Sequence, residues 1–405
     1  MSKIAFLTLG CKLNYAETST YERGFKAAGW DVVGWREKAD AYLVNTCSVT
    51  ATADTKSRNL IRKVHRINPE AEIYVTGCSA ELRRASIEAI EGVTRVYGAE
   101  EKSLVIPGGG GCEGAIFPAY STGERTRSFL KVQDGCNNFC KYCTVPYARG
   151  RSRNVPVCEC VKNARAIAAE GVKEIVLTGV NTGDFGRTTG ESFLDLLKAL
   201  NGVEGIERYR ISSIEPNLLT DEIVGWIASG TKFQPHFHIP LQTGSDELLG
   251  RMGRHYDTAF FEAKLSSIRE KMEAPGKPLV FFGIDVMVGL PGETREMFEG
   301  TVRFLERIRP AFIHVFPYSR RPGTPAAQMP GQVPEQTKAE RVARLEELSS
   351  RLNAEFTAAN RGIREKVLWE STDRGGRMEG YTGNYIRLER EWDETLCGRL
   401  CDVVI

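Results

Sequence analysis

The sequence lacks both long hydrophobic runs and a strong excess of charge of one sign. No stretch of about 18 apolar residues occurs in the chain, and the nearest candidate, residues 279–290, is interrupted by Gly283, Asp285 and Gly289. The formal net charge over 405 residues is +2, so any binding of nucleic acid must come from local basic patches. We therefore expect a protein that does not span a membrane.

A secretory signal is not expected either, because the apolar run at residues 4–9 is too short for one and has the length of a strand. Eleven cysteines without such a signal indicate a reducing compartment, where thiols serve metals rather than disulfides. We therefore expect a cytoplasmic protein. A monomer is also expected, although no feature of the sequence specifies the oligomeric state. Its length allows two or three domains.

Residues 1 to about 105 alternate short apolar runs with amphipathic segments. Strands are expected at residues 4–9, 41–44, 73–75 and 93–97, and helices at residues 56–67 and 80–90. This alternation predicts an α/β class of fold in which the N-terminal domain, residues 1–122, is a doubly wound parallel sheet. A linker rich in Gly and Pro is expected at residues 106–127.

The central part, residues 123–360, repeats a strand and helix unit six times. Its expected strands lie at residues 128–132, 174–180, 208–213, 236–241, 279–288 and 312–317. Such repeats predict a partial (β/α)6 barrel of the TIM type, with its site at the carboxyl ends of the strands. One long charged helix is expected at residues 335–359. The C-terminal part, residues 361–405, is expected to form a small all-β barrel from strands at residues 366–369, 385–388 and 400–404.

Three closely spaced cysteines, Cys136, Cys140 and Cys143, form the most informative motif, C-x3-C-x2-C. Three thiolates can hold three irons of a 4Fe–4S cluster and leave the fourth iron free to chelate a small molecule. The alternative is a structural zinc site, which needs a fourth ligand. The nearest downstream candidates, Cys158 and Cys160, lie beyond an arginine-rich stretch, so the spacing favours the cluster.

A second set of cysteines, Cys11, Cys47 and Cys78, is dispersed in the sequence, but each directly follows an expected strand. The carboxyl ends of parallel strands share one edge of a sheet, where ligands bind in open α/β folds. This placement predicts a second site with three cysteines. The alternative is three buried structural thiols, which are common in protein cores.

Several motifs together resemble a known family. The segment G-C-N-N-F-C-K-Y-C at residues 135–143 resembles the signature of radical S-adenosylmethionine enzymes. Together with Glu17, three further segments resemble the methylthiotransferases: G-C-K-L-N at residues 10–14, N-T-C-S-V-T at residues 45–50 and T-G-C at residues 76–78. That family joins an N-terminal domain with an auxiliary 4Fe–4S cluster, a radical barrel and an RNA-binding β-barrel of the TRAM type. The resemblance covers essentially the whole chain.

Within the family, three segments are similar to the branch that acts on N6-threonylcarbamoyladenosine next to the anticodon of tRNA: C-K-L-N at residues 11–14, A-D-T-K-S-R at residues 53–58 and H-V-F-P-Y-S at residues 314–319. The branch that acts on isopentenyladenosine more often has Gln-Met after the first cysteine, and the branch that acts on a ribosomal-protein aspartate has Pro-Lys. These two branches stay open as alternatives. A zinc-stabilised RNA-binding protein without catalysis is the non-enzymatic alternative.

The resemblance implies two 4Fe–4S clusters and S-adenosylmethionine as cofactors. The cluster at Cys136, Cys140 and Cys143 would bind S-adenosylmethionine for reductive cleavage to a 5′-deoxyadenosyl radical. The cluster at Cys11, Cys47 and Cys78 would carry the sulfur that becomes the methylthio group. An electron donor such as flavodoxin or ferredoxin and a sulfur source are then required. Contacts with S-adenosylmethionine are expected from the aromatic residue before the third cysteine of the closely spaced motif and from residues at or near strand ends: Tyr142, Gly179, Asn181, Ser212, Glu215, Gln242 and Asp285. Each of these residues could instead be a polar residue satisfied by the backbone.

The implied substrate is a base in the anticodon stem-loop of tRNA, where unstacked bases are accessible. RNA contacts are expected from basic stretches after two of the cysteines and from cations mixed with aromatics near the C-terminus. The candidates are Arg149, Arg151, Arg153, Lys56, Arg58, Arg374, Arg377 and Tyr385. The alternative for each is a solvated helix or loop face.

Overall fold

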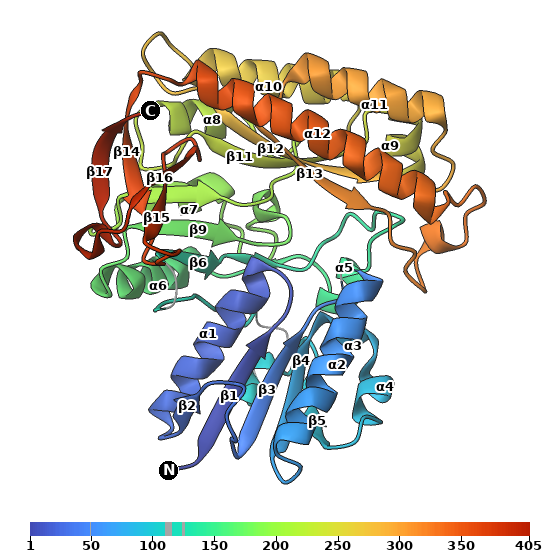
Figure 1. Cartoon of the computed structure of the whole chain (residues 1–405), viewed down its shortest axis with the longest axis vertical. Helices are drawn as coiled ribbons and strands as arrows, with labels where there is room; N and C mark the ends of the chain where they lie inside the picture. The colour runs from blue at the N-terminus through green and yellow to red at the C-terminus, as the bar shows by residue number, and fades with distance from the viewer. Residues whose placement is uncertain (49, 110–115, 124–125) are drawn as a thin grey trace.

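The computed structural model describes residues 1–48, 50–109, 116–123 and 126–405. Residues 110–115 and 124–125 of the expected linker between residues 106 and 127, together with Val49 of the second cysteine segment, therefore lie outside the described residues. Figure 1 shows three parts: an N-terminal sheet with its helices, a larger central part, and a small C-terminal sheet beside the central strands. The cysteine sites depend on how the first two parts meet.

The N-terminal part is a parallel five-stranded sheet of order β2-β1-β3-β4-β5. Its strands are β1 (Lys3–Thr8), β2 (Asp31–Val33), β3 (Ala41–Thr46), β4 (Glu72–Gly77) and β5 (Val93–Val96). Alternate strand residues pack on opposite faces, since Ile4 contacts the core under α1 (Lys12–Ala27) and Ala5 the core under α2 (Ala51–Ile67). The doubly wound parallel sheet is confirmed.

Two local features of this part differ from the expectation. Strand β2 was not expected, because three residues are too few to show an alternating pattern. The helix expected at residues 80–90 is two short helices, α3 (Cys78–Leu82) and α4 (Arg84–Glu88). They are separated at Arg83, whose φ of −131° and ψ of 25° are not helical. A 3-10 turn, η1 (Lys102–Val105), follows the sheet.

All six expected strands of the central part are present. Strands β6 (Arg127–Lys131), β9 (Glu174–Thr178) and β10 (Arg208–Ile211) form one parallel sheet, and β11 (His236–Gln242), β12 (Phe281–Val288) and β13 (Phe312–Pro317) form another. The two sheets are joined between β10 and β11 by loop bonds such as Ile214 N to His238 O (3.1 Å). The strands therefore form an interrupted arc, which is a partial barrel.

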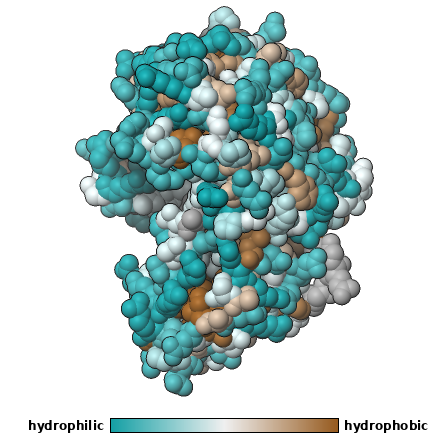
Figure 2. Space-filling view, turned by 90° about the vertical axis from the view of Figure 1, so that its right-hand side faces the viewer, coloured by the Kyte–Doolittle hydropathy of each residue, from teal (hydrophilic) through white to brown (hydrophobic). Residues whose placement is uncertain are grey.

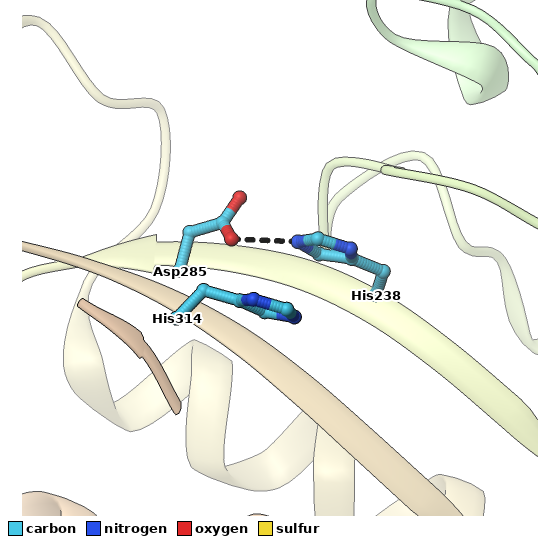
Figure 3. A group of neighbouring side chains, drawn as sticks. All are labelled: His238, Asp285 and His314. Atoms are coloured by element: carbon cyan, nitrogen blue, oxygen red, sulfur yellow. Dashed lines mark hydrogen bonds and ion pairs between the residues drawn. The ribbon is translucent and has the colours of Figure 1, made fainter. Parts of the chain in front are cut away.

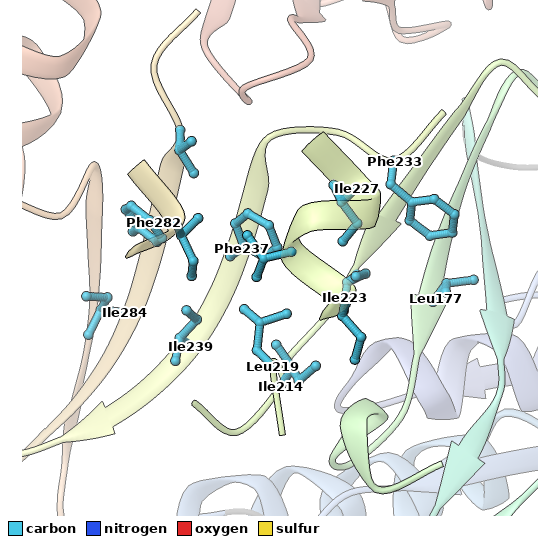
Figure 4. Close-up of a cluster of buried hydrophobic side chains, with 14 of the residues drawn as sticks. Leu177, Ile214, Leu219, Ile223, Ile227, Phe233, Phe237, Ile239, Phe282 and Ile284 are labelled. Carbon is cyan, nitrogen blue, oxygen red and sulfur yellow. The ribbon is translucent and has the colours of Figure 1, made fainter. Parts of the chain in front are cut away.

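One hydrophobic core lies between the strands and the helices that cover them, and it continues across the break between the two sheets. Figure 4 shows Leu177 of β9, Ile223 and Ile227 of α8, and Phe237 and Ile239 of β11 in this core. The covering helices are α6 (Val157–Ala169), α7 (Phe193–Asn201), α8 (Asp221–Ala228), α9 (Asp246–Met252), α10 (Thr258–Met272), α11 (Arg295–Ile308) and α12 (Glu335–Ala359). The long helix α12 has the predicted bounds.

Smaller elements surround the closely spaced cysteines. A two-stranded hairpin of β7 (Gln133–Asp134) and β8 (Arg153–Asn154) encloses them, together with the short helix α5 (Val145–Arg149). Two 3-10 turns complete the central part, η2 (Thr182–Asp184) after β9 and η3 (Pro325–Ala327) after β13. No helix in the described ranges is both long and apolar enough to cross a bilayer, and the face in Figure 2 is mostly hydrophilic with separate apolar patches.

The C-terminal part is a four-stranded antiparallel sheet of order β16-β15-β14-β17. Its strands are β14 (Arg364–Trp369), β15 (Arg377–Tyr381), β16 (Arg387–Glu391) and β17 (Leu400–Val404), and η4 (Glu394–Leu396) lies between the last two. The expectation missed β15, because its glycine-rich sequence indicates a loop. Gly380 serves packing there: a Cβ at this position would lie 2.5 Å from Val367 and 2.6 Å from Trp369.

Candidate functional site

Cys11, Cys47 and Cys78 converge at one edge of the N-terminal sheet. They follow β1, β3 and β4, which are neighbours in the sheet. The glycines before two of them are required by the packing. Gly10 has φ +105°, and a Cβ there would lie 2.9 Å from Cys47 Sγ. Gly77 has φ +98°, and a Cβ there would lie 2.3 Å from the Thr46 carbonyl oxygen. The predicted position of the three thiols is therefore observed.

Cys136, Cys140 and Cys143 lie in the loop between β7 and α5. Each sulfur accepts a hydrogen bond: Cys136 Sγ from the Asn138 amide (3.4 Å), Cys143 Sγ from the Val145 amide (3.4 Å) and Cys140 Sγ from Arg254 Nη1 (3.2 Å). Burial raises the pKa of Cys143 to about 12, so the folded chain alone keeps this thiol neutral. Three soft sulfur donors in such a loop fit an iron–sulfur cluster, because metal coordination deprotonates a thiol.

Arg254 is a site residue that no sequence signal indicated. Its guanidinium donates to Cys140 Sγ, contacts Tyr142 Oη at 3.5 Å and pairs with the Glu215 carboxylate. Its Nη2 also donates to Tyr256 Oη at 2.8 Å. Arg254 thus brings two of the predicted cofactor residues, Tyr142 and Glu215, to the closely spaced cysteines. Arginine has no fixed spacing from this motif, so only the fold identifies it.

Gln133 organises a second group of predicted residues at the ends of β9 and β10. Its Oε1 accepts the amides of Val180 (2.9 Å) and Asn181 (3.0 Å). A Cβ at Gly179 would lie 2.9 Å from the same oxygen, so a larger residue there would require the Gln133 side chain to shift. Asn181 Oδ1 in turn accepts the Glu215 amide at 3.3 Å. Gly179, Asn181 and Glu215 therefore share one surface.

Three other predicted cofactor residues have different surroundings. Ser212 follows β10, and its buried hydroxyl has no hydrogen-bond partner among the described residues. Gln242 ends β11 at a bulge and has φ +74°. Asp285 instead lies inside β12, where its carboxylate binds His238 Nε2 at 2.6 Å. Asp285 thus belongs to a separate cluster with two histidines.

The RNA contact predicted for Arg149 is wrong, because this side chain is buried with 2% exposure. Arg149 Nη1 binds Asp134 at 2.9 Å and Glu17 at 3.4 Å. Lys131 and Lys102 bind the same Glu17 oxygen at 2.7 and 2.8 Å. We call Glu17, Lys102, Lys131, Asp134 and Arg149 the buried ion network. The sequence predicted a surface position for Arg149, because the sequence pattern after a cluster motif does not distinguish an exposed arginine from a buried one.

The buried ion network joins the two cysteine sites. Arg149 ends the short helix after Cys143, and its Nη2 donates to Asn14 Oδ1. Asn14 Nδ2 donates to the carbonyls of Leu9 (2.7 Å) and Thr46 (2.9 Å), which precede Cys11 and Cys47. Burial raises the pKa of Cys78, and the positive charge of Arg149 lowers it. The buried ion network therefore fixes the two cysteine sites relative to each other. It also places the positive charge of Arg149 beside the thiols.

The remaining RNA candidates lie at accessible positions, but several have protein partners. Lys56 and Arg58 are exposed on α2, and the Arg151 guanidinium lies 4.5 Å above the Phe139 ring. Arg153 donates to the Arg149 carbonyl at 2.9 Å. Near the C-terminus, Arg374 pairs with Glu379 (3.1 Å), Arg377 with Glu389 (3.5 Å), and Tyr385 Oη with Arg127 (3.1 Å). Their role in RNA binding stays a prediction.

A cavity of about 1110 Å³ lies where the three parts of the chain meet. Lys12 and Tyr15 line it from α1, His238 and His314 from the central strands, and Tyr385 from the C-terminal sheet. The Lys12 side chain is exposed to the space of the cavity, and protein surrounds that space. The surrounding protein and the positive charges of Arg127 and Arg210 lower the pKa of Lys12. A space of this size beside Cys11 can admit a nucleobase with its substituent.

Comparisons with known proteins identify the relatives of this chain. The model of the Radical SAM superfamily matches residues 130–305, and that of an uncharacterized protein family, UPF0004, matches residues 3–98. The solved structure of the radical S-adenosylmethionine methyltransferase TsrM from Kitasatospora setae, with cobalamin and a [4Fe-4S] cluster bound, superposes with a TM-score of 0.59 at 15% identity. The match covers 81% of this chain and 77% of that one. The chain is thus a radical SAM protein.

Sequence relatives define the family more narrowly. The threonylcarbamoyladenosine tRNA methylthiotransferase MtaB of Bacillus subtilis is 39% identical over all of this chain and 94% of its own length. The protein of the same name from Aquifex aeolicus is 36% identical over the full length of both. A tRNA-2-methylthio-N(6)-dimethylallyladenosine synthase from Carboxydothermus hydrogenoformans is 30% identical over 98% of this chain and 95% of its own. The chain belongs to the methylthiotransferase family of radical SAM proteins.

Proposed function

We propose that this protein is a radical SAM methylthiotransferase that converts N6-threonylcarbamoyladenosine, next to the anticodon of tRNA, into its 2-methylthio derivative. The observation that carries the proposal is the pair of three-cysteine sites on one frame, joined through Asn14 and Arg149. Relatives named for this activity are 34–39% identical to the chain. Relatives named for the dimethylallyl substrate are 30–32% identical, and the zinc-stabilised RNA-binding alternative is not favoured.

The six cysteines are the residues that hold the two 4Fe–4S clusters. When bound, the clusters and S-adenosylmethionine supply the radical and sulfur chemistry that replaces an unactivated C–H bond, which acid–base side chains cannot do. Arg254 orients Cys140 and Tyr142 by direct contact. Gln133 fixes the loop of Gly179 and Asn181 beside Glu215. These polar groups are suited to bind the amino, carboxylate and adenine groups of S-adenosylmethionine.

We also infer three domains, residues 1–122, 123–360 and 361–405, of which the last is a TRAM-like unit that binds RNA. Accessible cations in all three parts of the chain support this role: Lys56 and Arg58 on α2, Arg151 and Arg153 after the closely spaced cysteines, and Arg374 and Arg377 in the C-terminal part. Tyr385 lines the cavity itself. The enzyme would act as a cytoplasmic monomer on the anticodon stem-loop and would receive electrons from a flavodoxin or ferredoxin and sulfur from a separate source.

The test combines metal analysis with a nucleoside assay. Anaerobically reconstituted protein should contain about eight irons with matching acid-labile sulfide, and Cys136→Ala/Cys140→Ala/Cys143→Ala should retain about four. The variant Cys11→Ala/Cys47→Ala/Cys78→Ala should also retain about four. The matched control Cys158→Ala, on exposed helix surface, should retain all of them. Zinc without sulfide would overturn the proposal.

The nucleoside assay determines the substrate. Reconstituted enzyme with S-adenosylmethionine and a reductant should convert N6-threonylcarbamoyladenosine in tRNA into a product heavier by one methylthio group in place of hydrogen. Tandem mass spectrometry of digested tRNA detects this product. Conversion of isopentenyladenosine alone would contradict the proposed substrate while leaving the reaction class in place.

A further inference from the structure

Lys12 is the distinctive cation of the central cavity. Four arginines also line the cavity, but each is paired with a glutamate: Arg127 with Glu370, Arg210 with Glu174, Arg374 with Glu379 and Arg387 with Glu379. In the part of the chain that the structure describes, no side chain forms a hydrogen bond or ion pair with Lys12 Nζ. An accessible, unpaired ammonium group among paired arginines is available to a ligand anion.

His238 and His314 line the same cavity and form a polar cluster with Asp285. Figure 3 shows the two imidazole rings stacked one over the other, with Asp285 hydrogen-bonded to His238. The ring centroids are 4.8 Å apart and the planes are inclined by 6°. A metal ion held by two imidazoles lies in the plane of both rings, which stacked parallel rings do not allow. The cluster is therefore a hydrogen-bonding surface and not a metal site.

The hydrogen-bonding capacity of this cluster is defined by its geometry. His238 Nε2 lies 2.6 Å from Asp285 Oδ1, and in the tautomer that donates from Nε2 to this carboxylate, Nδ1 of the ring is left as an acceptor. His314 stacks on His238 and carries one further donor and one further acceptor. The cavity thus offers the ammonium group of Lys12 together with hydrogen-bonding ring nitrogens of His238 and His314.

We propose that Lys12, His238 and His314 form the subsite that recognises the threonylcarbamoyl group, with Lys12 on its carboxylate and the two histidines on its hydroxyl and urea groups. This assignment rests on the proposed function. A threonylcarbamoyl substituent carries one carboxylate, one hydroxyl and N–H groups, which match the free groups of the cavity one by one. A dimethylallyl substituent is a hydrocarbon and would leave the ammonium and both imidazoles without partners.

The position of the subsite agrees with this assignment. Lys12 directly follows Cys11 in the sequence. A nucleobase bound near the site of Cys11, Cys47 and Cys78 therefore places its substituent within reach of Lys12. Lys12 and His314 also come from two of the segments that resemble the threonylcarbamoyl branch, and the fold brings these segments from opposite ends of the chain into one cavity. Residues other than the six cysteines then determine which substituent on the adenosine the enzyme accepts.

The test compares two anticodon stem-loop RNAs, one with N6-threonylcarbamoyladenosine and one with its carboxamide analogue, which lacks only the negative charge. Fully reconstituted wild-type enzyme should favour the acid by about 10- to 100-fold in kcat/KM, the range typical of a hydrogen bond between charged groups. In Lys12→Gln this preference should fall to near one, and Lys12→Arg should restore most of it. The matched control Lys162→Gln removes an equally charged group from exposed helix surface outside the cavity and should keep the wild-type preference.

A second variant tests the histidines. His314→Phe keeps an aromatic ring against His238 and removes the polar atoms, so kcat/KM should fall by about 3- to 10-fold for both RNAs alike. Iron content and RNA binding by fluorescence anisotropy should be measured for every variant, because Lys12 adjoins a cluster cysteine. If wild type modifies the acid RNA and Lys12→Gln keeps the full acid preference, the subsite is refuted and the proposed function stands. If reconstituted wild type modifies neither RNA, the proposed function fails with it.

Discussion

Glu17 is the residue whose removal should damage the protein most without touching a cysteine. Its side chain is fully buried, and Oε1 accepts from Lys131 at 2.7 Å, Lys102 at 2.8 Å and Arg149 at 3.4 Å. Glu17→Gln keeps the shape of the side chain but leaves three buried cations with Asp134 as the one remaining carboxylate of the buried ion network. Breaking a buried charge pair in this way costs about 3–5 kcal/mol in the free energy of unfolding.

The assay is anaerobic urea unfolding of the reconstituted protein, followed by tryptophan fluorescence and by the visible absorption of the clusters. Glu22→Gln is the matched control, because Glu22 lies on the same helix and pairs with Lys26 at 2.7 Å on the surface. That exposed pair should contribute less than about 1 kcal/mol. A Glu17→Gln variant no less stable than Glu22→Gln would refute the view that the buried ion network holds the two parts together.

Three further predictions concern acid stability, the second cluster and RNA binding. Burial opposes ionisation of Glu17, but Lys102, Lys131 and Arg149 lower its pKa from 4.5 to about 2, so its stabilising contribution should be complete above pH 4.5 and disappear as the pH falls toward 2. The stability difference between wild type and Glu17→Gln should shrink over that range in acid unfolding titrations. Gly77→Ala should lower iron content from about eight toward about four, because its Cβ would collide with the Thr46 carbonyl beside the site of Cys11, Cys47 and Cys78. Arg377→Ala should raise KM for tRNA and reduce the salt dependence of binding by about one charge, without loss of reductive cleavage of S-adenosylmethionine, and unchanged tRNA kinetics would contradict that role.

The fold and the cysteine sites could be predicted because they depend on local sequence patterns. Apolar runs separated by amphipathic segments specify parallel strands, and the carboxyl ends of such strands lie at one edge. Cys11, Cys47 and Cys78 therefore could be grouped although they lie up to 67 positions apart. The antiparallel C-terminal part was harder, because β15 depends on Gly380 packing under Trp369 and has no hydrophobic alternation.

The polar residues around the cysteines could not be predicted, since their partners are distant in sequence and charged residues do not reveal burial. Arg254 contacts Cys140 from 114 positions away, and Arg149 contacts Glu17 from 132 positions away. A lysine such as Lys131 inside a strand also contradicts the usual exposure of charged side chains. Only the fold shows that its charge is neutralised by Glu17 and Asp134.

The buried ion network explains how two separately folded sheets can hold two cysteine sites in a defined relation. Apolar contacts between α1 and β6, such as those of Ala16 and Phe129, add stability but tolerate small shifts. Charged hydrogen bonds are directional. A displacement of α1 relative to β6 would separate Glu17 from Lys131 and leave both charges buried without their partner, which is strongly destabilising. Because reacting groups must approach within about 3–3.5 Å of one another, the position of the substrate between the two sites depends on this interface. We therefore expect variants of the buried ion network to uncouple cleavage of S-adenosylmethionine from formation of the methylthio product before they prevent folding.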